Sequence, residues 1–152
     1  MKNNLESHIE KNKNILIYVD GKLMSRDEAK VSVYDSGFMM GDGVWEGIRL
    51  YNNKWLFLDE HIHRLYEGAK AIDLDINLTK DQLKNALFDT QKINKMIDRA
   101  HARVMITRGI KSKPFQRPSY SLDGPTIVII MEHSEDNIKR EPITLATVSQ
   151  IR

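Results

Sequence analysis

The stretch GDGVWEGIRLYNNKWLFLDEHIHRLYEGAKAI (residues 41–72) changes its hydrophobic period halfway along, and this change decides the fold class. Its first part contains two apolar-rich runs, residues 43–51 and 54–58, joined by Asn52-Asn53. Because Asn tolerates a positive φ, this pair can close a β-hairpin. Beyond the hairpin the apolar residues recur every three or four positions, as on one face of a helix of roughly four turns. The stretch therefore predicts a hairpin that leads directly into a helix.

The sequence on either side predicts further strands and one more helix. The run ILIYVDGKLM (15–24) predicts a hairpin, because Asp20-Gly21 supplies turn residues between two apolar runs. A second helix is expected to begin at Thr79, which with Gln82 has the spacing of a capping box. Three later strands are expected at residues 101–108, 126–133 and 143–149.

This order of elements predicts an α+β fold, with a largely antiparallel sheet and two helices packed on one side. The strand at 126–133 is apolar on both faces, so we expect it to be central or sandwiched. Residues 1–14 hold five charges and are expected to form a flexible arm. Residues 15–152 are expected to form one domain.

Composition excludes several classes of function. The absence of Cys excludes a disulfide framework, a Cys-based zinc site and a thiol nucleophile. Together with the lack of an apolar run at the N-terminus, it favours a cytoplasmic location. A net charge of +2 is too weak to predict nucleic-acid binding, and no stretch is apolar enough to suggest a membrane helix. We expect no metal site, because His61 and His63 would point about 200° apart on a helix.

A cluster of glycines is the first candidate binding feature. Gly37, Gly41, Gly43 and Gly47 lie within eleven residues. Such a cluster predicts backbone that closely approaches another chain or a ligand. A bulged and twisted strand followed by a turn is the alternative, and composition alone favours it.

Two arginines beside apolar positions are the other candidates. Arg64 emerges next to the apolar stripe of the first helix, where it could bind a phosphate or carboxylate through two parallel hydrogen bonds. Pairing with Glu60 or Glu67 at helical spacing is the more common arrangement. Arg103 lies within an apolar strand and requires either an anionic partner or a solvated face.

Taken together and in this order, the motifs resemble the fold-type IV pyridoxal-phosphate enzymes. The most specific parts are G-D-G-V-[aromatic]-E-G at 41–47 and L-x-E-H-x-x-R-L at 58–65. The family includes branched-chain and D-amino-acid aminotransferases, R-selective amine transaminases and aminodeoxychorismate lyase. The resemblance extends over residues 15–152 and implies the small N-terminal domain of the class IV aminotransferase fold.

The resemblance also implies roles for individual residues. Arg64 matches the arginine that binds the cofactor phosphate, and Trp45 matches an aromatic residue that lines the substrate pocket. Met40 occupies a pocket position where branched-chain enzymes often carry Tyr, which favours a D-amino acid or an amine as substrate. Arg49 and Arg103 match polar positions at or near the pocket in some subfamilies.

The cationic loop after the strand at 101–108 matches the segment that covers the active site in the family. On this basis Arg108, Lys111, Lys113 or Arg117 is expected to meet a substrate carboxylate. The lysine that binds the cofactor covalently lies in the family beyond the position matching residue 152. We therefore expect no catalytic residue within these 152 residues, which would form the N-terminal part of an enzyme and be inactive alone.

The implied function is amino-group transfer between an amino acid or amine and a 2-oxo acid, with pyridoxal 5'-phosphate as cofactor. The family resemblance further implies a homodimer. Two alternatives remain open: an aminodeoxychorismate lyase-like enzyme of the same fold, and a non-catalytic α+β binding domain.

Overall fold

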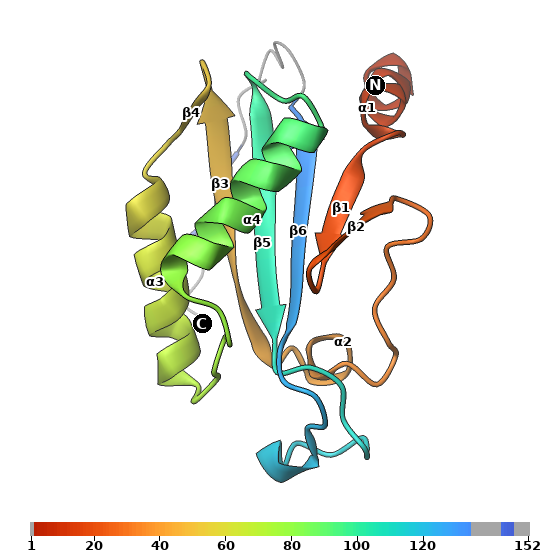
Figure 1. The fold of residues 1–152 in the computed structure, drawn as a ribbon. Coiled ribbons are helices and arrows are strands. Elements are labelled where there is room, and N and C mark those ends of the chain that lie inside the picture. The colour runs from red at the N-terminus through yellow and green to blue at the C-terminus, as the bar shows by residue number, and fades with distance from the viewer. Residues whose placement is uncertain (1, 135–143, 148–152) are drawn as a thin grey trace.

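A single antiparallel sheet organises the protein in the computed structural model, which describes residues 2–134 and 144–147 (Figure 1). Its strands are β1 (Leu16–Val19), β2 (Lys22–Ser25), β3 (Gly43–Tyr51), β4 (Lys54–Trp55), β5 (Ala100–Thr107) and β6 (Thr126–His133). The helices are α1 (Lys2–Asn12), α2 (Ser36–Met40), α3 (Leu58–Ala71) and α4 (Lys80–Ile93), and a short 3-10 helix, η1, spans Pro118–Tyr120.

The strand order is β2-β1-β6-β5-β3-β4, and every pairing is antiparallel. β5 pairs along its whole length with β6 on one side and with β3 on the other. β6 lies between β5 and β1. The prediction that residues 126–133 form a central strand is therefore confirmed.

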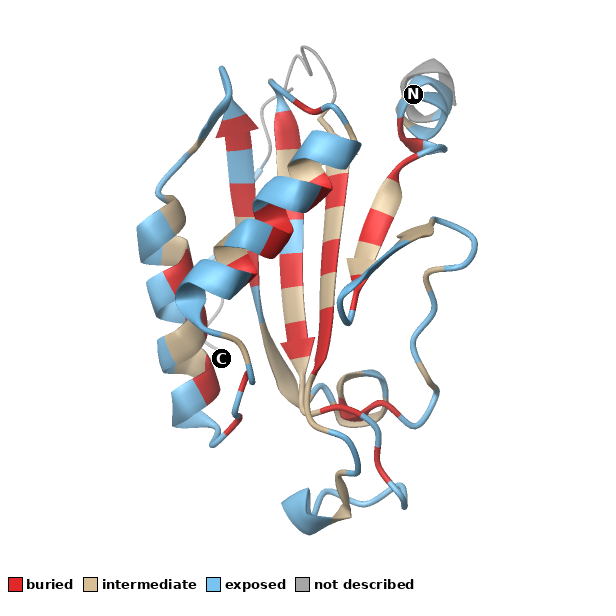
Figure 2. Cartoon of the chain, in the orientation of Figure 1, coloured by how far each residue is buried: buried red, intermediate tan, exposed pale blue. Residues whose placement is uncertain are grey.

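Helices α3 and α4 cover one face of the sheet (Figures 1 and 2). α3 packs along β3, and α4 crosses the sheet to contact β6 and β1. The inward side chains of α3 are Ile62, Leu65 and Ala69, and those of α4 include Leu83 and Leu87. They pack on the buried residues of the strands, which include Ile48, Leu50, Ala102, Val104, Ile106, Ile129 and Met131. The predicted α+β fold, with two helices on one side of an antiparallel sheet, is confirmed.

Local sequence signals explain where the two packing helices begin. The Thr79 hydroxyl accepts a hydrogen bond from the Gln82 backbone, and the Gln82 side chain accepts one from the Thr79 backbone. This is the predicted capping box, and it places the start of α4 at Lys80. α3 carries Asp59 and Glu60 in its first turn, where negative charge interacts favourably with the helix dipole.

Two local features in the first half of the chain differ from the sequence prediction. The second strand of the central hairpin ends at Trp55, because Phe57 adopts a left-handed conformation (φ 52°) and caps α3. Residues 2–12 of the expected arm form a helix, α1. Its end is attached to β6 by buried Asn12, whose side chain donates to the carbonyl of His133 and accepts from the amide of the same residue.

The expected final strand at 143–149 is wrong over residues 144–147, which form no regular structure. The alternating pattern predicts a half-buried strand, but Leu145 is 83% exposed and packs on no sheet face. The remainder of that segment lies outside the described residues.

Candidate active-site surface

The face of the sheet opposite α3 and α4 carries three of the predicted site residues. Side chains alternate along β3, so that Glu46 and Ile48 point toward the helices while Trp45 and Arg49 point away from them. Arg103 on β5 lies opposite Gly47 of β3 and therefore shares the face of Trp45 and Arg49. The structure thus brings Trp45, Arg49 and Arg103 together on one surface.

Trp45 and Arg103 are in direct contact on this surface. The Arg103 guanidinium carbon lies 4.5 Å from the centre of the Trp45 ring, within the range of a cation–π interaction. Trp45 is 59% exposed, so the pair faces outward and is accessible to a ligand. The sequence predicted that Arg103 has either an anionic partner or a solvated face, and in this structure it lies on a solvated face.

His101 lies between the two arginines of this face. It is directly opposite Arg49 on β3, two residues before Arg103 on its own strand. Burial lowers the pKa of His101, and the charges of Arg49 and Arg103 lower it further. These effects favour the neutral imidazole, and the arginines supply the positive charge that would attract an anionic ligand.

An apolar groove of about 450 Å3 adjoins this cationic region. Its lining includes Trp45 and Met105 from the sheet and Phe38 from α2. Met40, the last residue of α2, is half-buried and does not line the groove. The predicted pocket role of Met40 is therefore not visible in this arrangement, whereas Phe38 occupies a position that the sequence did not single out.

The glycines approach the protein's own backbone and side chains. A Cβ atom on Gly43 would lie 2.5 Å from the carbonyl oxygen of Ile106 on β5. One on Gly47 would lie 2.9 Å from Nε2 of His101. Both glycines therefore allow β3 and β5 to pair closely and leave room for the His101 ring. Within this structure, neighbouring parts of the same chain explain the close approach.

Arg64 lies in a polar cluster on the other side of β3. Glu46, which is 6% exposed, accepts hydrogen bonds from Arg64 Nε (2.5 Å) and Nη2 (2.7 Å). Nδ1 of His61 is 2.8 Å from the same carboxylate. The hydrogen bonds from Arg64 hold the pKa of Glu46 below its usual value, with a smaller contribution from His61, although burial opposes this shift. Arg64 therefore pairs with Glu46, and not with the helical neighbours that its spacing suggested.

The pairing leaves part of the Arg64 guanidinium available. Its side chain is 71% exposed, and Nη1 has no hydrogen-bond partner among the described residues. Glu46 fixes the orientation of the guanidinium while the outer N–H groups point toward solvent. A fixed and exposed guanidinium has the chemistry needed to bind a phosphate group. The donor set of this chain therefore fits the phosphate end of pyridoxal 5'-phosphate.

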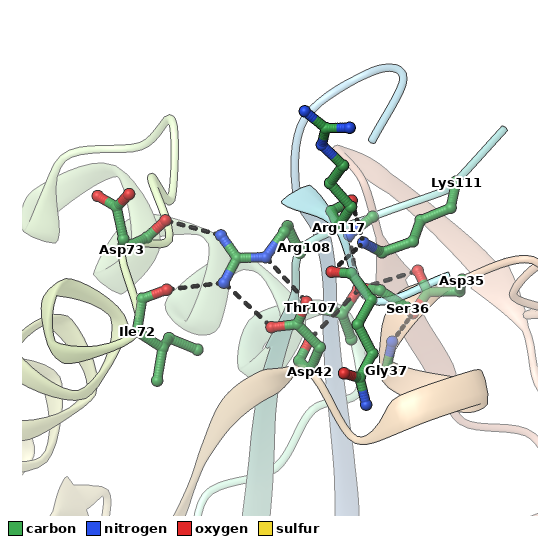
Figure 3. Close-up of polar contacts among 12 residues, drawn as sticks. Asp35, Ser36, Gly37, Asp42, Ile72, Asp73, Thr107, Arg108, Lys111 and Arg117 are labelled. Atoms are coloured by element: carbon green, nitrogen blue, oxygen red, sulfur yellow. Dashed lines mark hydrogen bonds and ion pairs between the residues drawn. The ribbon is translucent and has the colours of Figure 1, made fainter. Parts of the chain in front are cut away.

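Two of the four loop cations are engaged within the protein (Figure 3). The Arg108 guanidinium binds the Asp42 carboxylate and two backbone carbonyls. The Lys111 side chain is almost fully buried and donates to the carbonyls of Gln116 and Arg117, each at 3.2 Å. Arg108 and Lys111 are therefore committed to internal contacts.

The other two loop cations remain exposed. Nζ of Lys113 lies 5.5 Å from the centre of the Tyr120 ring. The guanidinium of Arg117 points away from the contacts of Arg108 and Lys111 that Figure 3 draws. Of the four loop cations, Lys113 and Arg117 are thus the accessible candidates for a carboxylate contact.

Within residues 2–134 and 144–147, no group of three His, Asp or Glu side chains could hold a metal ion. None of the helices described is both long enough and apolar enough to cross a membrane.

Comparison with known proteins shows that this chain is similar to aminotransferases. The family model for "Amino-transferase class IV" matches residues 43–152. Branched-chain-amino-acid aminotransferase-like protein 1 of Arabidopsis thaliana is 38% identical over 124 residues, which are 82% of this chain and 22% of that protein. D-alanine aminotransferase of Listeria innocua is 40% identical over 96 residues, which are 63% of this chain and 33% of that protein. The chain thus spans a third or less of the length of these relatives.

The fold is also similar to solved structures. A branched-chain amino acid aminotransferase from T.th., complexed with N-(5'-phosphopyridoxyl)-L-glutamate, superposes with a TM-score of 0.70 and 25% identity. The match covers 80% of this chain and 41% of the solved chain.

Proposed function

The chain belongs to the class IV aminotransferase family, and from this membership we propose that the protein transfers an amino group between an amino acid or amine and a 2-oxo acid. Its proposed cofactor is pyridoxal 5'-phosphate. Relatives named as branched-chain and D-alanine aminotransferases support the reaction, and the phosphopyridoxyl ligand of a similar solved structure supports the cofactor. The observation that carries the proposal is the exposed Arg64 guanidinium, fixed by Glu46 within the family motif.

Arg64 is proposed to bind the cofactor phosphate. Glu46 accepts from Nε and Nη2, so the guanidinium keeps one orientation and presents its remaining N–H groups. His61 contacts the same carboxylate and limits its movement. When bound, pyridoxal 5'-phosphate supplies the electron sink that makes amino-group transfer possible. The role of this chain is to hold the phosphate end in place.

The opposite face of the sheet is proposed to contribute to the substrate pocket. Trp45 and the adjoining groove provide apolar surface for a side chain. Arg103 and Arg49 provide positive charge for a carboxylate, and the Trp45 ring holds the Arg103 guanidinium by a cation–π contact. Met40 is proposed to influence the pocket through the position of α2, because it does not itself line the groove.

Catalysis is proposed to require residues beyond this chain. The chain covers 22% and 33% of two curated relatives, so most of their length has no counterpart in these residues. Lys111, the most buried of the described lysines, is bound to backbone carbonyls at the base of a loop. We propose that the catalytic lysine lies in a second domain, that residues 1–152 alone are inactive, and that the complete enzyme is a cytoplasmic homodimer.

A substrate panel on the full-length protein tests the reaction. The panel combines 2-oxoglutarate or pyruvate with L-branched-chain amino acids, D-alanine or a chiral amine, and measures the amino-acid product. Amino-group transfer with at least one donor is expected. Release of pyruvate from aminodeoxychorismate, without transfer from any donor, would instead establish the lyase alternative. Absence of both activities, with no binding of pyridoxal 5'-phosphate, would leave a non-catalytic binding domain and refute the proposal.

A further inference from the structure

Arg108 connects the sheet to the C-terminal end of α3 (Figure 3). Its Nε and Nη2 atoms donate to the Asp42 carboxylate at 2.8 and 3.1 Å. Nη2 also donates to the carbonyl of Ile72, and Nη1 donates to that of Asp73, both at 2.7 Å. The Arg108 side chain is only 14% exposed. These contacts occupy both sides of the guanidinium, so Arg108 acts as a bridge between two elements.

The Arg108 bridge is the second attachment between β3 and α3, after the contact between Glu46 and Arg64. Asp42 directly precedes β3, and Glu46 lies four residues further along, a separation of about 13 Å on an extended chain. Arg64 on α3 and Ile72, which caps the C-terminus of that helix, are eight residues apart, a separation of about 12 Å along a helix. Because these two lengths agree, the carboxylates of Asp42 and Glu46 can each hold one end of the helical segment between Arg64 and Ile72.

The two attachments differ in how they hold the helix. Glu46 binds α3 directly through Arg64, whereas Asp42 binds it through the Arg108 guanidinium. Arg108 contacts backbone carbonyls at the end of α3, where a positive charge interacts favourably with the helix dipole. The Arg64 attachment adds one fixed point near the middle of α3 to the packing of its buried side chains on the sheet. The Arg108 attachment adds a second fixed point at the C-terminal end of the helix.

We propose that Arg108 is a positioning residue for Arg64. It fixes the position and tilt of α3 against β3, so that the outer N–H groups of Arg64 remain where an anionic group binds. This inference rests on the proposed function, in which Arg64 binds the cofactor phosphate. Four of the five N–H groups of Arg108 donate to Asp42 and the end of α3, so its proposed role is to act through Arg64 and not by touching cofactor or substrate.

A double-mutant cycle on the full-length protein tests the coupling. The variants are Arg64→Met, Arg108→Met and their combination, and the matched control is Arg26→Met, which removes an arginine paired with Glu132 away from α3. Equilibrium dialysis measures the Kd for pyridoxamine 5'-phosphate, and circular dichroism measures Tm. We expect each single variant at Arg64 or Arg108 to raise Kd by about tenfold or more, and the control to leave it unchanged. The double variant is expected to bind no more weakly than Arg64→Met, although Arg108→Met lowers Tm in both backgrounds.

The outcomes separate the two claims. If Arg64→Met leaves Kd unchanged, the proposed role of Arg64 in cofactor binding fails. If Arg64→Met raises Kd but Arg108→Met does not, or if the two effects add in full, the positioning role of Arg108 is overturned. Should Arg108→Met not fold, Arg108→Lys keeps the charge but cannot reach Asp42 and both carbonyls at once. That variant is expected to fold and to raise Kd, and an unchanged Kd would overturn the inference.

Discussion

Replacing Glu46 by Gln tests whether the buried carboxylate holds α3 against the sheet. The two oxygens of Glu46 accept from Arg64 Nε and Nη2. Gln has the same size but presents one NH2 group, which faces an Arg64 N–H in either orientation of the amide. Glu46→Gln therefore replaces one charge-assisted hydrogen bond with two opposed donors and weakens the other.

The expected loss of stability follows from this geometry. A hydrogen bond to a charged group contributes about 1.5–3 kcal/mol. Because the Arg64 side chain is 71% exposed, solvent screening places the loss at the lower end, about 1.5 kcal/mol. For a domain of this size, such a change lowers Tm by about 3–6 °C.

The pH dependence gives the test a direction. The pKa of Glu46 is lowered by its hydrogen bonds to Arg64, so its carboxylate form is favoured in the folded state. A group with a depressed folded pKa stabilises the protein above its unfolded pKa of about 4.3, and this contribution is lost as pH falls through the folded pKa. The stability difference between wild type and Glu46→Gln should therefore be constant near pH 7 and shrink below about pH 4.

Thermal unfolding followed by circular dichroism between pH 3 and pH 8 measures this difference. Glu67→Gln is the matched control, because it makes the same chemical change at an exposed position on α3. The control is expected to stay within about 0.5 kcal/mol of wild type. A Glu46→Gln variant as stable as wild type at pH 7, or a difference that persists unchanged to pH 3, would refute the reasoning.

Three further substitutions test other parts of the structure. Gly43→Ala should destabilise the protein by about 1–3 kcal/mol, since the new Cβ would lie 2.5 Å from the carbonyl oxygen of Ile106; wild-type stability in urea unfolding would contradict this close approach. Lys111→Met should increase hydrogen exchange across the loop at 110–122, because the carbonyls of Gln116 and Arg117 lose the buried ammonium that donates to them. Unchanged protection would show that the ammonium does not hold the loop. Asn12→Ala should cost about 1–3 kcal/mol, because a backbone amide and carbonyl of β6 lose their side-chain partner, and an unchanged Tm would exclude this attachment of α1.

The elements of the fold that could be predicted are those with local signals. The Asp20-Gly21 turn, the helical spacing after Leu58 and the capping box at Thr79 each depend on a few neighbouring residues. Residues 143–149 show the limit of such signals. Their alternation is typical of a strand, but a strand also requires a neighbour to pair with, and residues 144–147 are exposed.

The contacts of the candidate site could be predicted less completely. The sequence identifies Arg64 as an anion-binding candidate, but its partner Glu46 lies on another element eighteen residues away. The alternation of β3 contained a signal for it, since Glu46 occupies an inward position between Val44 and Ile48, where a carboxylate requires a cation. The burial of Lys111 had no comparable signal, because its partners are backbone carbonyls that only the folded loop brings together.

The pairing of β1 with β6 has a consequence for synthesis on the ribosome. Val19 meets Val128, so the edge of the first hairpin finds its partner only after about 110 further residues have been made. At about 5–20 residues per second, this takes roughly 5–20 s. During that interval β1 exposes an unpaired strand edge, which is a site for association with other nascent chains. Chaperone dependence during translation should therefore be concentrated in the N-terminal hairpin, and it should end once β6 emerges.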